Sequence, residues 1–154
     1  MKKILGLVLL LGIGYTANAT ELILAKAPTK MAADDATVGI NFFHGTWQEA
    51  LAIAQEENKL IFLDAYAAWC GPCKMMARTT FKEKEVGDFF NANFINVKMD
   101  MEKHAEGPRL SNDLYLTAYP TLYFLNHTEK PVYKTLGFLD AEKLISEGKK
   151  ALKI

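Results

Sequence analysis

Two cysteines separated by two residues are the feature of this 154-residue chain that most clearly points to chemistry. Cys70 and Cys73 enclose Gly71 and Pro72 and follow directly on Trp69. A disulfide across two residues closes a very short loop, so it restrains little of the unfolded chain and contributes little stability. A pair that opens and closes would instead exchange disulfides, since one thiolate attacks a sulfur atom and a second thiol releases the mixed disulfide. The spacing therefore indicates a thiol–disulfide oxidoreductase.

The cysteine pair falls between a predicted strand and a predicted helix. Residues 60–66 form a short, nearly continuous apolar run, which is typical of a strand covered on both faces. Helix formers follow Cys73 as far as Arg78. A cysteine at a helix N-terminus faces unpaired amides and the positive end of the helix dipole, and both stabilise a thiolate. Cys70 is thus the predicted nucleophile, and Cys73, one turn into the helix, is the predicted resolving thiol and is expected to be the more buried.

A static structural bridge and a metal site are the alternatives for the cysteine pair. Structural zinc takes four ligands, usually two cysteine pairs or two cysteines with two histidines. The three histidines, His44, His104 and His127, lie far apart in the sequence. We therefore expect no metal and no organic cofactor, with the Cys70–Cys73 pair as the redox-active group.

Asp64 interrupts the apolar run six residues before Cys70. Burying a carboxylate is costly unless it is paired or protonated. A buried acid beneath the disulfide can accept the proton of Cys73, through water, when that thiol attacks. An acid at the edge of the strand, or one in a purely structural ion pair, is the alternative interpretation of Asp64.

The N-terminus has the pattern of an export signal. Lys2 and Lys3 precede an apolar core over residues 4–15, and Ala17-Asn18-Ala19 is a small-x-small cleavage site. The core of about 12 residues is shorter than the roughly 20 that a membrane helix needs. We expect cleavage after Ala19 and a periplasmic or otherwise exported protein, where thiols tend to become disulfides. An uncleaved membrane anchor is the alternative.

The composition is that of one globular domain. Half of the residues are hydrophobic, 23% are charged, and 18 basic residues balance 18 acidic ones. The chain has no basic excess that would indicate nucleic-acid binding and no acidic run that would indicate a charged tail. We expect a monomer. The predicted organisation is a signal peptide at 1–19, a linker or N-terminal arm at 20–38, and a single domain at 39–154.

Hydrophobic periodicity predicts alternating strands and helices in the domain. A capping box opens one helix, because Thr46 can cap free amides while Glu49 reaches back. The order of elements predicts an α/β fold, a central mixed sheet with helices on both faces. The predicted elements are a short edge strand at 39–43, a helix at 46–57 stopped by Asn58, a strand at 60–66, helices up to 78 and at 84–91, a strand at 94–99, a short helix from 107, strands at 121–125 and 132–138, and a last helix at 141–152 that Asp140 caps and that turns Leu144, Ile145 and Leu152 inward.

With these motifs in view, the sequence resembles thioredoxin. Residues 62–74, FLDAYAAWCGPCK, resemble its active-site strand and loop, and residues 118–122, AYPTL, resemble its proline loop. Gly137 stands after the hairpin strand, where thioredoxins also place a glycine. The resemblance covers roughly residues 40–153 and implies the thioredoxin fold. It also implies a reductant, because Gly71-Pro72 is the dipeptide that thioredoxin carries between its cysteines.

The resemblance further implies roles for residues outside the cysteine motif. Lys98 resembles the lysine that thioredoxins place beside the buried acid, with an exposed lysine at a strand end as the alternative. Pro120 is expected to follow a cis peptide bond, with an ordinary trans proline that opens a strand as the alternative. Such a bond would place the backbone of Tyr119 beside the disulfide, ready to pair with an extended substrate strand, and would keep metal away from the thiols. Trp69 and Tyr119 offer aromatic surface to a substrate, with packing as the alternative role. Together with Gly71, Pro72 and Pro120, these two residues make up the predicted substrate-binding set.

The sequence departs from thioredoxin at Arg78, where thioredoxin has a helix-kinking proline. Residues 79–86 and the helix at 46–57 are more similar to the exported thioredoxin-like group that includes the C-terminal domain of the transmembrane disulfide reductase DsbD. This resemblance implies protein disulfides as substrates, which are reduced or reshuffled, and a membrane electron donor of the DsbD type. A thioredoxin-like binding module, a chaperone or maturation factor with little turnover, is the alternative.

Overall fold

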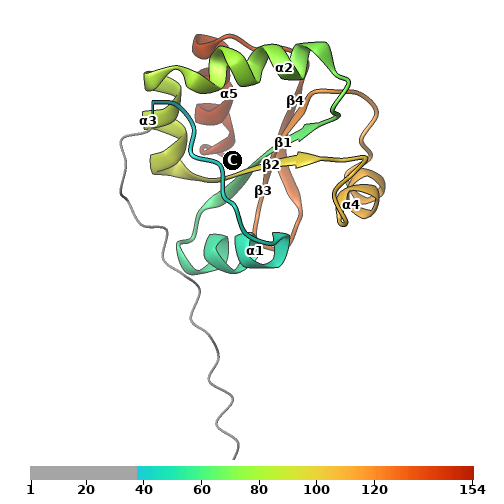
Figure 1. Ribbon diagram of the computed structural model, residues 1–154. Coiled ribbons are helices and arrows are strands. Elements are labelled where there is room, and N and C mark those ends of the chain that lie inside the picture. Colours follow the sequence, from blue (N-terminus) through green and yellow to red (C-terminus); the bar gives the residue numbers. More distant parts are fainter. Residues whose placement is uncertain (1–37) are drawn as a thin grey trace, which may run out of the picture.

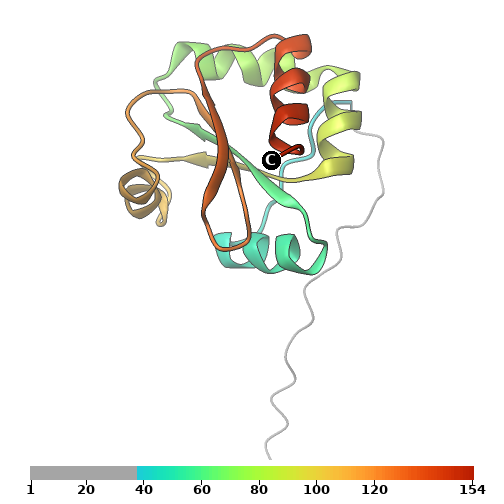
Figure 2. The same ribbon diagram turned by 180° about the vertical axis from the view of Figure 1, so that it is seen from behind.

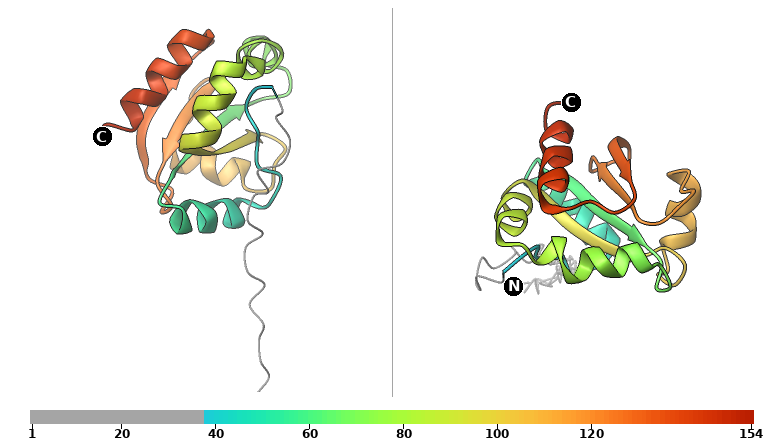
Figure 3. Two further views of the ribbon diagram at one scale, coloured as in Figure 1. Left: turned by 90° about the vertical axis from the view of Figure 1, so that its left-hand side faces the viewer. Right: turned by 90° about the horizontal axis from the view of Figure 1, so that it is seen from above.

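The computed structural model describes residues 38–154, so the predicted signal peptide and almost all of the predicted arm lie outside the described residues. Four strands form one sheet in the order β2-β1-β3-β4, and helices lie on both of its sides (Figures 1 and 3). Strand β1 pairs with β2 in parallel and with β3 in antiparallel orientation, and β3 pairs with β4 in antiparallel orientation. The predicted mixed sheet is confirmed.

From residue 46 on, the helices and strands follow the predicted order. Among the described residues, none of the helices combines the length and the apolar character that a membrane crossing requires. The elements are α1 Trp47–Glu56, β1 Leu60–Tyr66, α2 Gly71–Arg78, the 3-10 turn η1 Thr80–Lys82, α3 Lys84–Asn93, β2 Phe94–Asp100, α4 Gly107–Asp113, β3 Thr121–Leu125, β4 Pro131–Leu136 and α5 Ala141–Ala151.

The core has two halves, one on each face of the sheet. Leu63 of β1 is fully buried in the half that also holds Trp47 of α1 and Leu110 of α4. Its neighbour Phe62 is fully buried in the other half, with Phe90 of α3 and side chains of α2 and α5. Because helices cover both faces, successive residues of β1 are all apolar except the one acid, which explains the unbroken apolar run in the sequence.

Local capping sets the helix ends as predicted. The Thr46 side chain accepts from the Glu49 amide while the Glu49 side chain accepts from the Thr46 amide, which completes the capping box of α1. Asn58 has a φ of 50°, a conformation that asparagine tolerates and that ends the helical path. At the other end of the domain, the Asp140 side chain caps α5 by accepting from the Lys143 amide.

The prediction of a short edge strand at 39–43 is wrong. This segment runs beside α3 and β2 without joining the sheet. One of its amides does bond to a strand: Phe43 donates to the carbonyl of Asn96 in β2 at 2.7 Å. Ile40 donates instead to the carbonyl of Phe81 at 2.8 Å, and Asn41 donates to the side-chain oxygen of Asn91 at 2.9 Å. A turn carbonyl and a side-chain amide thus satisfy two donors that a strand would pair in a ladder.

The inward position predicted for Leu152 is also wrong. Helix α5 buries Leu144, Gly148 and Ala151, which recur at helical spacing, and Ile145 is half-buried. Leu152 lies one residue beyond the end of the helix and is 45% exposed. The sequence analysis extended the last helix to residue 152 and therefore placed a surface leucine in the core.

Candidate active site

The end of β1 and the start of α2 hold the two cysteines together. Cys70 is the N-cap of α2, and it forms a disulfide with Cys73. The Cys70 sulfur accepts a hydrogen bond from the Cys73 amide at 3.2 Å. Pro72 stands in the first helical turn, where an amide hydrogen would have no partner within the helix. The local sequence therefore places one sulfur against the free amides of a helix N-terminus.

Both cysteines are buried, each with 2% of its surface exposed. The expectation that Cys73 is the more buried of the two is wrong, because Cys70 also packs with Ala67 and with the partly buried ring of Tyr119. Gly71, between the cysteines, is exposed and has open space around the position of a side chain. The dipeptide Gly71-Pro72 therefore lies on the protein surface next to the buried disulfide.

The proline loop lies against the disulfide. The Tyr119–Pro120 peptide bond is cis, as the resemblance implied. The carbonyl of Pro120 accepts from the Gly137 amide at 2.9 Å, which ties the loop to the residue after β4. Gly137 has a φ of 88°, which favours glycine at this junction. Residues far apart in the sequence thus meet beside the cysteine pair.

Trp69 and Tyr119 form an aromatic wall next to the cysteines. Their ring centroids are 5.7 Å apart in an edge-to-face arrangement, and Trp69 is 67% exposed. The Trp69 indole donates to both carboxylate oxygens of Glu102, at 2.9 and 3.1 Å. Burial, and then the charges of Glu102 and Asp100, raise the pKa of Tyr119. Sequence reasoning missed Glu102, since an acid in a loop 33 residues beyond Trp69 carries no signal by itself.

Asp64 is buried in the middle of β1, 1% exposed, and pairs with Lys98 directly opposite on β2. One carboxylate oxygen takes this ion pair, and the other, Oδ1, has no hydrogen-bond partner in the described part of the chain. Burial raises the pKa of Asp64, and the nearby Lys98 ammonium opposes that rise. The pairing that the resemblance implied is therefore present, and Asp64 is not at the edge of the sheet.

Three aromatic rings surround the Lys98 ammonium. Its nitrogen lies 4.2 Å from the ring centroid of Tyr66, 5.4 Å from that of Phe81 and 5.9 Å from that of Phe42. Ring faces attract a cation at such distances. The rings come from β1, from η1 and from the segment before α1, so the sequence does not show that they gather around one lysine.

Residues 38–154 contain no group of three or more His, Cys, Asp or Glu side chains that could hold a metal ion. The two cysteines are bonded to each other. The three histidines come from separate parts of the fold: His44 precedes α1, His104 lies between β2 and α4, and His127 lies in the turn between β3 and β4.

A mixed sheet between helices, a Cys-x-x-Cys pair at a helix N-terminus and a cis-proline loop against it together define a thioredoxin-like protein. The model of the Thioredox_DsbH family, described as a protein of unknown function, DUF255, matches residues 24–144, and the chain belongs to this family.

Individual relatives agree with this assignment. The chain is 28% identical over 136 residues to the chloroplastic thioredoxin Y of Oryza sativa subsp. japonica, which covers 88% of this chain and 75% of that protein. A structure from Bacteroides thetaiotaomicron, proposed to be a disulphide-isomerase, is 40% identical with a TM-score of 0.67 and covers 76% of this chain and 96% of its own. The oxidised C-terminal domain of Neisseria meningitidis DsbD is 26% identical with a TM-score of 0.58. This match covers 72% of the present chain and 99% of the DsbD domain. The chain is thus one of the thioredoxin-like disulfide oxidoreductases.

Proposed function

We propose that this protein is an exported thiol–disulfide oxidoreductase that uses its Cys-Gly-Pro-Cys dithiol to reduce or reshuffle protein disulfides. The observation that carries the proposal is the position of Cys70: its sulfur lies at the N-terminus of α2, 3.2 Å from the Cys73 amide nitrogen, and the cysteine pair packs against Tyr119 of the cis-proline loop. In the reduced protein the same amide and the helix dipole would stabilise a Cys70 thiolate and lower its pKa.

The exchange begins with the reduced protein. The Cys70 thiolate attacks one sulfur of the substrate disulfide, a new bond forms between Cys70 and that sulfur, and the other substrate sulfur leaves as a thiolate that takes up a proton. Cys73 then loses its proton and attacks the Cys70 sulfur. The second substrate sulfur leaves and is protonated, and the Cys70–Cys73 disulfide of the present structure is restored. The substrate gains two electrons and two protons, which the protein's two thiols supply.

Asp64 is the proposed proton acceptor for Cys73. It is buried on β1, the strand that leads into the cysteine loop, and its Oδ1 is not used by Lys98. Burial raises the pKa of Asp64, so a proton is held more readily there than on an exposed carboxylate. Lys98 opposes this rise and so favours return of the carboxylate to its charged form for the next cycle.

The substrate-contact surface is assigned to the exposed residues around the disulfide. Gly71 and Pro72 are exposed next to the buried disulfide, and Trp69 and Tyr119 present aromatic surface beside it. The backbone next to Pro120 is suited to pair with an extended substrate segment. A flexible polypeptide carrying a disulfide fits this arrangement better than a compact small molecule, because the contacts extend on either side of the cysteines.

Export and an external electron donor complete the proposal. The basic pair Lys2-Lys3, the apolar residues 4–15 and the Ala17-Asn18-Ala19 site support export with cleavage after Ala19. Each turnover leaves the protein oxidised, so a second dithiol must return two electrons and two protons. The similarity to the C-terminal domain of DsbD supports a membrane donor of that type.

Reduction of insulin by the protein, with dithiothreitol as the electron source, tests the proposal. Wild type should accelerate the reaction, Cys70→Ser should abolish the acceleration, and Cys73→Ser should accumulate a mixed disulfide on Cys70. Turnover that survives Cys70→Ser would contradict the mechanism. A wild type that binds reduced or oxidised polypeptides without turnover would favour the binding module instead.

A further inference from the structure

Two large apolar side chains are exposed around one hollow next to the proline loop. Tyr115 is 82% exposed and Leu136 is 58% exposed, and both line this hollow. Leu136 precedes Gly137, whose amide bonds to the carbonyl of Pro120 in the proline loop. Exposed apolar side chains that meet at a hollow mark a binding region more often than scattered single residues do.

Two adjoining hollows lie here, on the face of the sheet that α1 and α4 cover elsewhere. The larger, about 460 Å³, lies between the end of α4 and β4, with Leu114, Tyr115 and Pro131 among its lining residues. The smaller, about 220 Å³, lies between Tyr115 and Leu136. Both share Tyr115 and Lys134. They are therefore two parts of one groove, which we call the hairpin groove.

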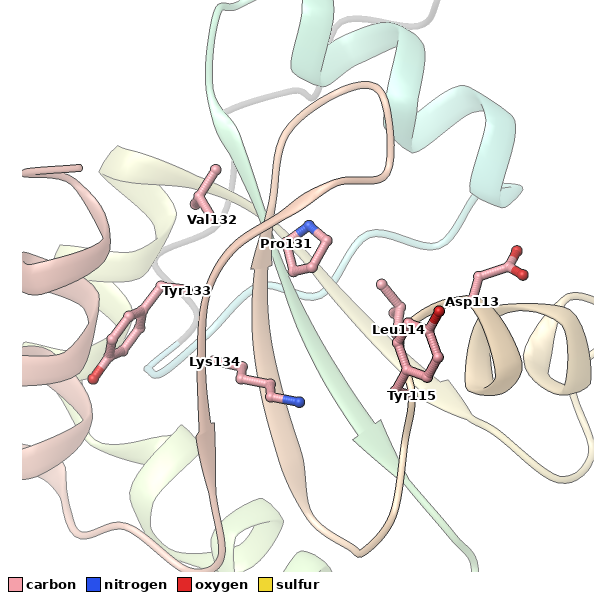
Figure 4. Close-up of a pocket in the computed structure, with 7 residues that line it drawn as sticks. All are labelled: Asp113, Leu114, Tyr115, Pro131, Val132, Tyr133 and Lys134. Carbon is pink, nitrogen blue, oxygen red and sulfur yellow. The ribbon is translucent and has the colours of Figure 1, made fainter.

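The hairpin groove exists because no helix covers β4 on this side. Within residues 38–154, the core half beneath α1 and α4 contains buried residues of β1, β2 and β3 and none of β4. Tyr133 of β4 turns the other way and bonds to Glu147 of α5, whereas Lys134 and Pro131 point toward the side of Tyr115 (Figure 4). Figure 2 shows the β3–β4 hairpin from the side on which α5 lies beside it. The opposite side of β4 is the open one.

Tyr115 has a backbone conformation that does not suit its side chain. Its φ is 52°, in the left-handed region where glycine and asparagine are common and a bulky residue is rare. The ring gains little from burial in return, since most of it is exposed. An exposed aromatic residue held at an unfavourable φ is better explained by contact with a ligand than by the stability of the fold.

Lys134 gives the groove a positive charge. In the described part of the chain no carboxylate lies within salt-bridge distance of its ammonium, which is 5.8 Å from the centroid of the Tyr123 ring. The nearby Asp113 is already paired with Arg109. An acidic side chain of a partner would therefore find an available cation next to an apolar hollow.

We propose that the hairpin groove binds the substrate polypeptide at a second point, remote from its cysteine. The occupant is an extended segment of the disulfide-bearing substrate, with a large apolar side chain in the larger hollow and a carboxylate beside Lys134. This inference rests on the proposed function, because the groove continues the exchange site: Thr121, which follows Pro120, and Leu136, which precedes Gly137, line its near end. Shared surface with the exchange site favours the same polypeptide as the occupant of both.

The length of β4 sets the distance between the two points. Leu136 lies at the exchange-site end and Pro131 at the far end, five residues along a strand, or about 17 Å. An extended substrate segment covers that distance in about five residues. The reactive cysteine lies beyond the Leu136 end, so the favoured substrates carry an apolar residue about five or more positions from that cysteine, with an acidic residue near it.

The rates at which the protein reduces matched peptide substrates test the proposal. Peptides with one cysteine, blocked as a mixed disulfide with a small reporter thiol, are reduced by the protein with dithiothreitol as the electron source. The distant set carries phenylalanine or serine five, six or seven residues from the cysteine, on either side, with glutamate next to it. A second pair carries the same exchange two residues from the cysteine. The serine peptide is the internal reference for each variant, and the readout is the ratio of kcat/KM values.

We expect phenylalanine at the distant position to raise kcat/KM at least fivefold in wild type. Tyr115→Asn, which suits the left-handed φ, should bring the ratio close to one. Lys134→Glu, which places a like charge beside the peptide glutamate, should lower kcat/KM for both the phenylalanine and the serine peptide of the distant set. Leu152→Asn and Lys153→Glu, matched changes at the far C-terminus, should keep the wild-type ratio. A wild-type ratio near one at the distant position, or a ratio unchanged in Tyr115→Asn, overturns the proposal.

The same peptides and variants distinguish two other results. Failure of wild type to reduce any of the peptides would count against the proposed function itself, since the groove can act only on a working exchange site. A dimer that forms with rising concentration and is lost in Tyr115→Asn would show that a second copy of the chain occupies the groove, which overturns the assignment to substrate.

Discussion

Replacing Asp64 with asparagine should make the protein more stable and less active. The side chain is 1% exposed, so its charged form is held in the interior at a cost that only Lys98 offsets. Asparagine has nearly the same shape and no charge. The lysine left behind is 26% exposed and lies among three aromatic rings, so water and those rings can still solvate it.

The sign of the pH dependence follows from the direction of the pKa shift. Burial raises the pKa of Asp64 above its unfolded value, so the stability linked to this group is fully present below the unfolded pKa and is lost as pH rises through the folded pKa. Asp64→Asn removes that loss. We expect the variant to match wild type near pH 4 and to exceed it by about 1–2 kcal/mol at pH 8, which is a fraction of the several kcal/mol that burying one ion costs, because Lys98 offsets the rest.

Urea unfolding of the oxidised proteins between pH 4 and pH 9 measures this difference, and thermal unfolding should show a rise of about 4–8 °C at pH 8. Insulin reduction by Asp64→Asn should fall by about tenfold to a hundredfold, because Cys73 loses its proton acceptor. Lys98→Met is the matched control: it leaves the acid without its cation, so its stability should fall more steeply with pH than that of wild type. An Asp64→Asn variant less stable than wild type at pH 8, or one with wild-type turnover, would refute the reasoning.

Three further changes test the fold around the site. Gly87→Ala should lower the free energy of unfolding by about 1–3 kcal/mol in urea titrations, because a side chain there would lie 2.2 Å from the carbonyl oxygen of Gly39; an unchanged midpoint would contradict this close approach. Hydrogen bonds from Arg109 lower the pKa of Glu129, whose contribution to stability is thus present above its unfolded pKa and lost as pH falls through the folded one. Glu129→Gln should therefore cost about 1 kcal/mol at pH 7 and less at pH 3, and an equal loss at both would argue against the ion pair. Tyr115→Asn should raise stability by up to about 1 kcal/mol by relieving the left-handed φ, and a lowered melting temperature would contradict that strain.

The sequence was sufficient for elements whose pattern is local. The apolar run at 60–66 has one periodicity and one interpretation, and the capping box of Thr46 and Glu49 depends on residues three apart. Cys70 and Cys73 predicted disulfide exchange, because two cysteines two residues apart at the start of a predicted helix place both sulfurs at one helix end. The same holds for Asp64, whose burial follows from its place in an otherwise apolar strand.

What the sequence could not show depends on contacts between distant segments. Residues 39–43 look like a strand, but they bond to the carbonyl of Phe81 and to the side chain of Asn91, and no local pattern reveals these partners. Glu102 is one acid among 18 acidic residues until the fold brings it to Trp69. The equal burial of the two cysteines likewise depends on the proline loop, since Tyr119 packs against the pair.

The most direct test of the central claim is to identify the cysteine on which substrates are held. Cys70→Ser and Cys73→Ser are expressed with an affinity tag in the host cell, thiols are blocked on lysis, and covalent complexes are resolved by mass before and after dithiothreitol. The account predicts polypeptides released by dithiothreitol from Cys73→Ser, where Cys70 remains, and none from Cys70→Ser. Complexes held on Cys73 instead, or none on either variant while wild type reduces insulin, would contradict it.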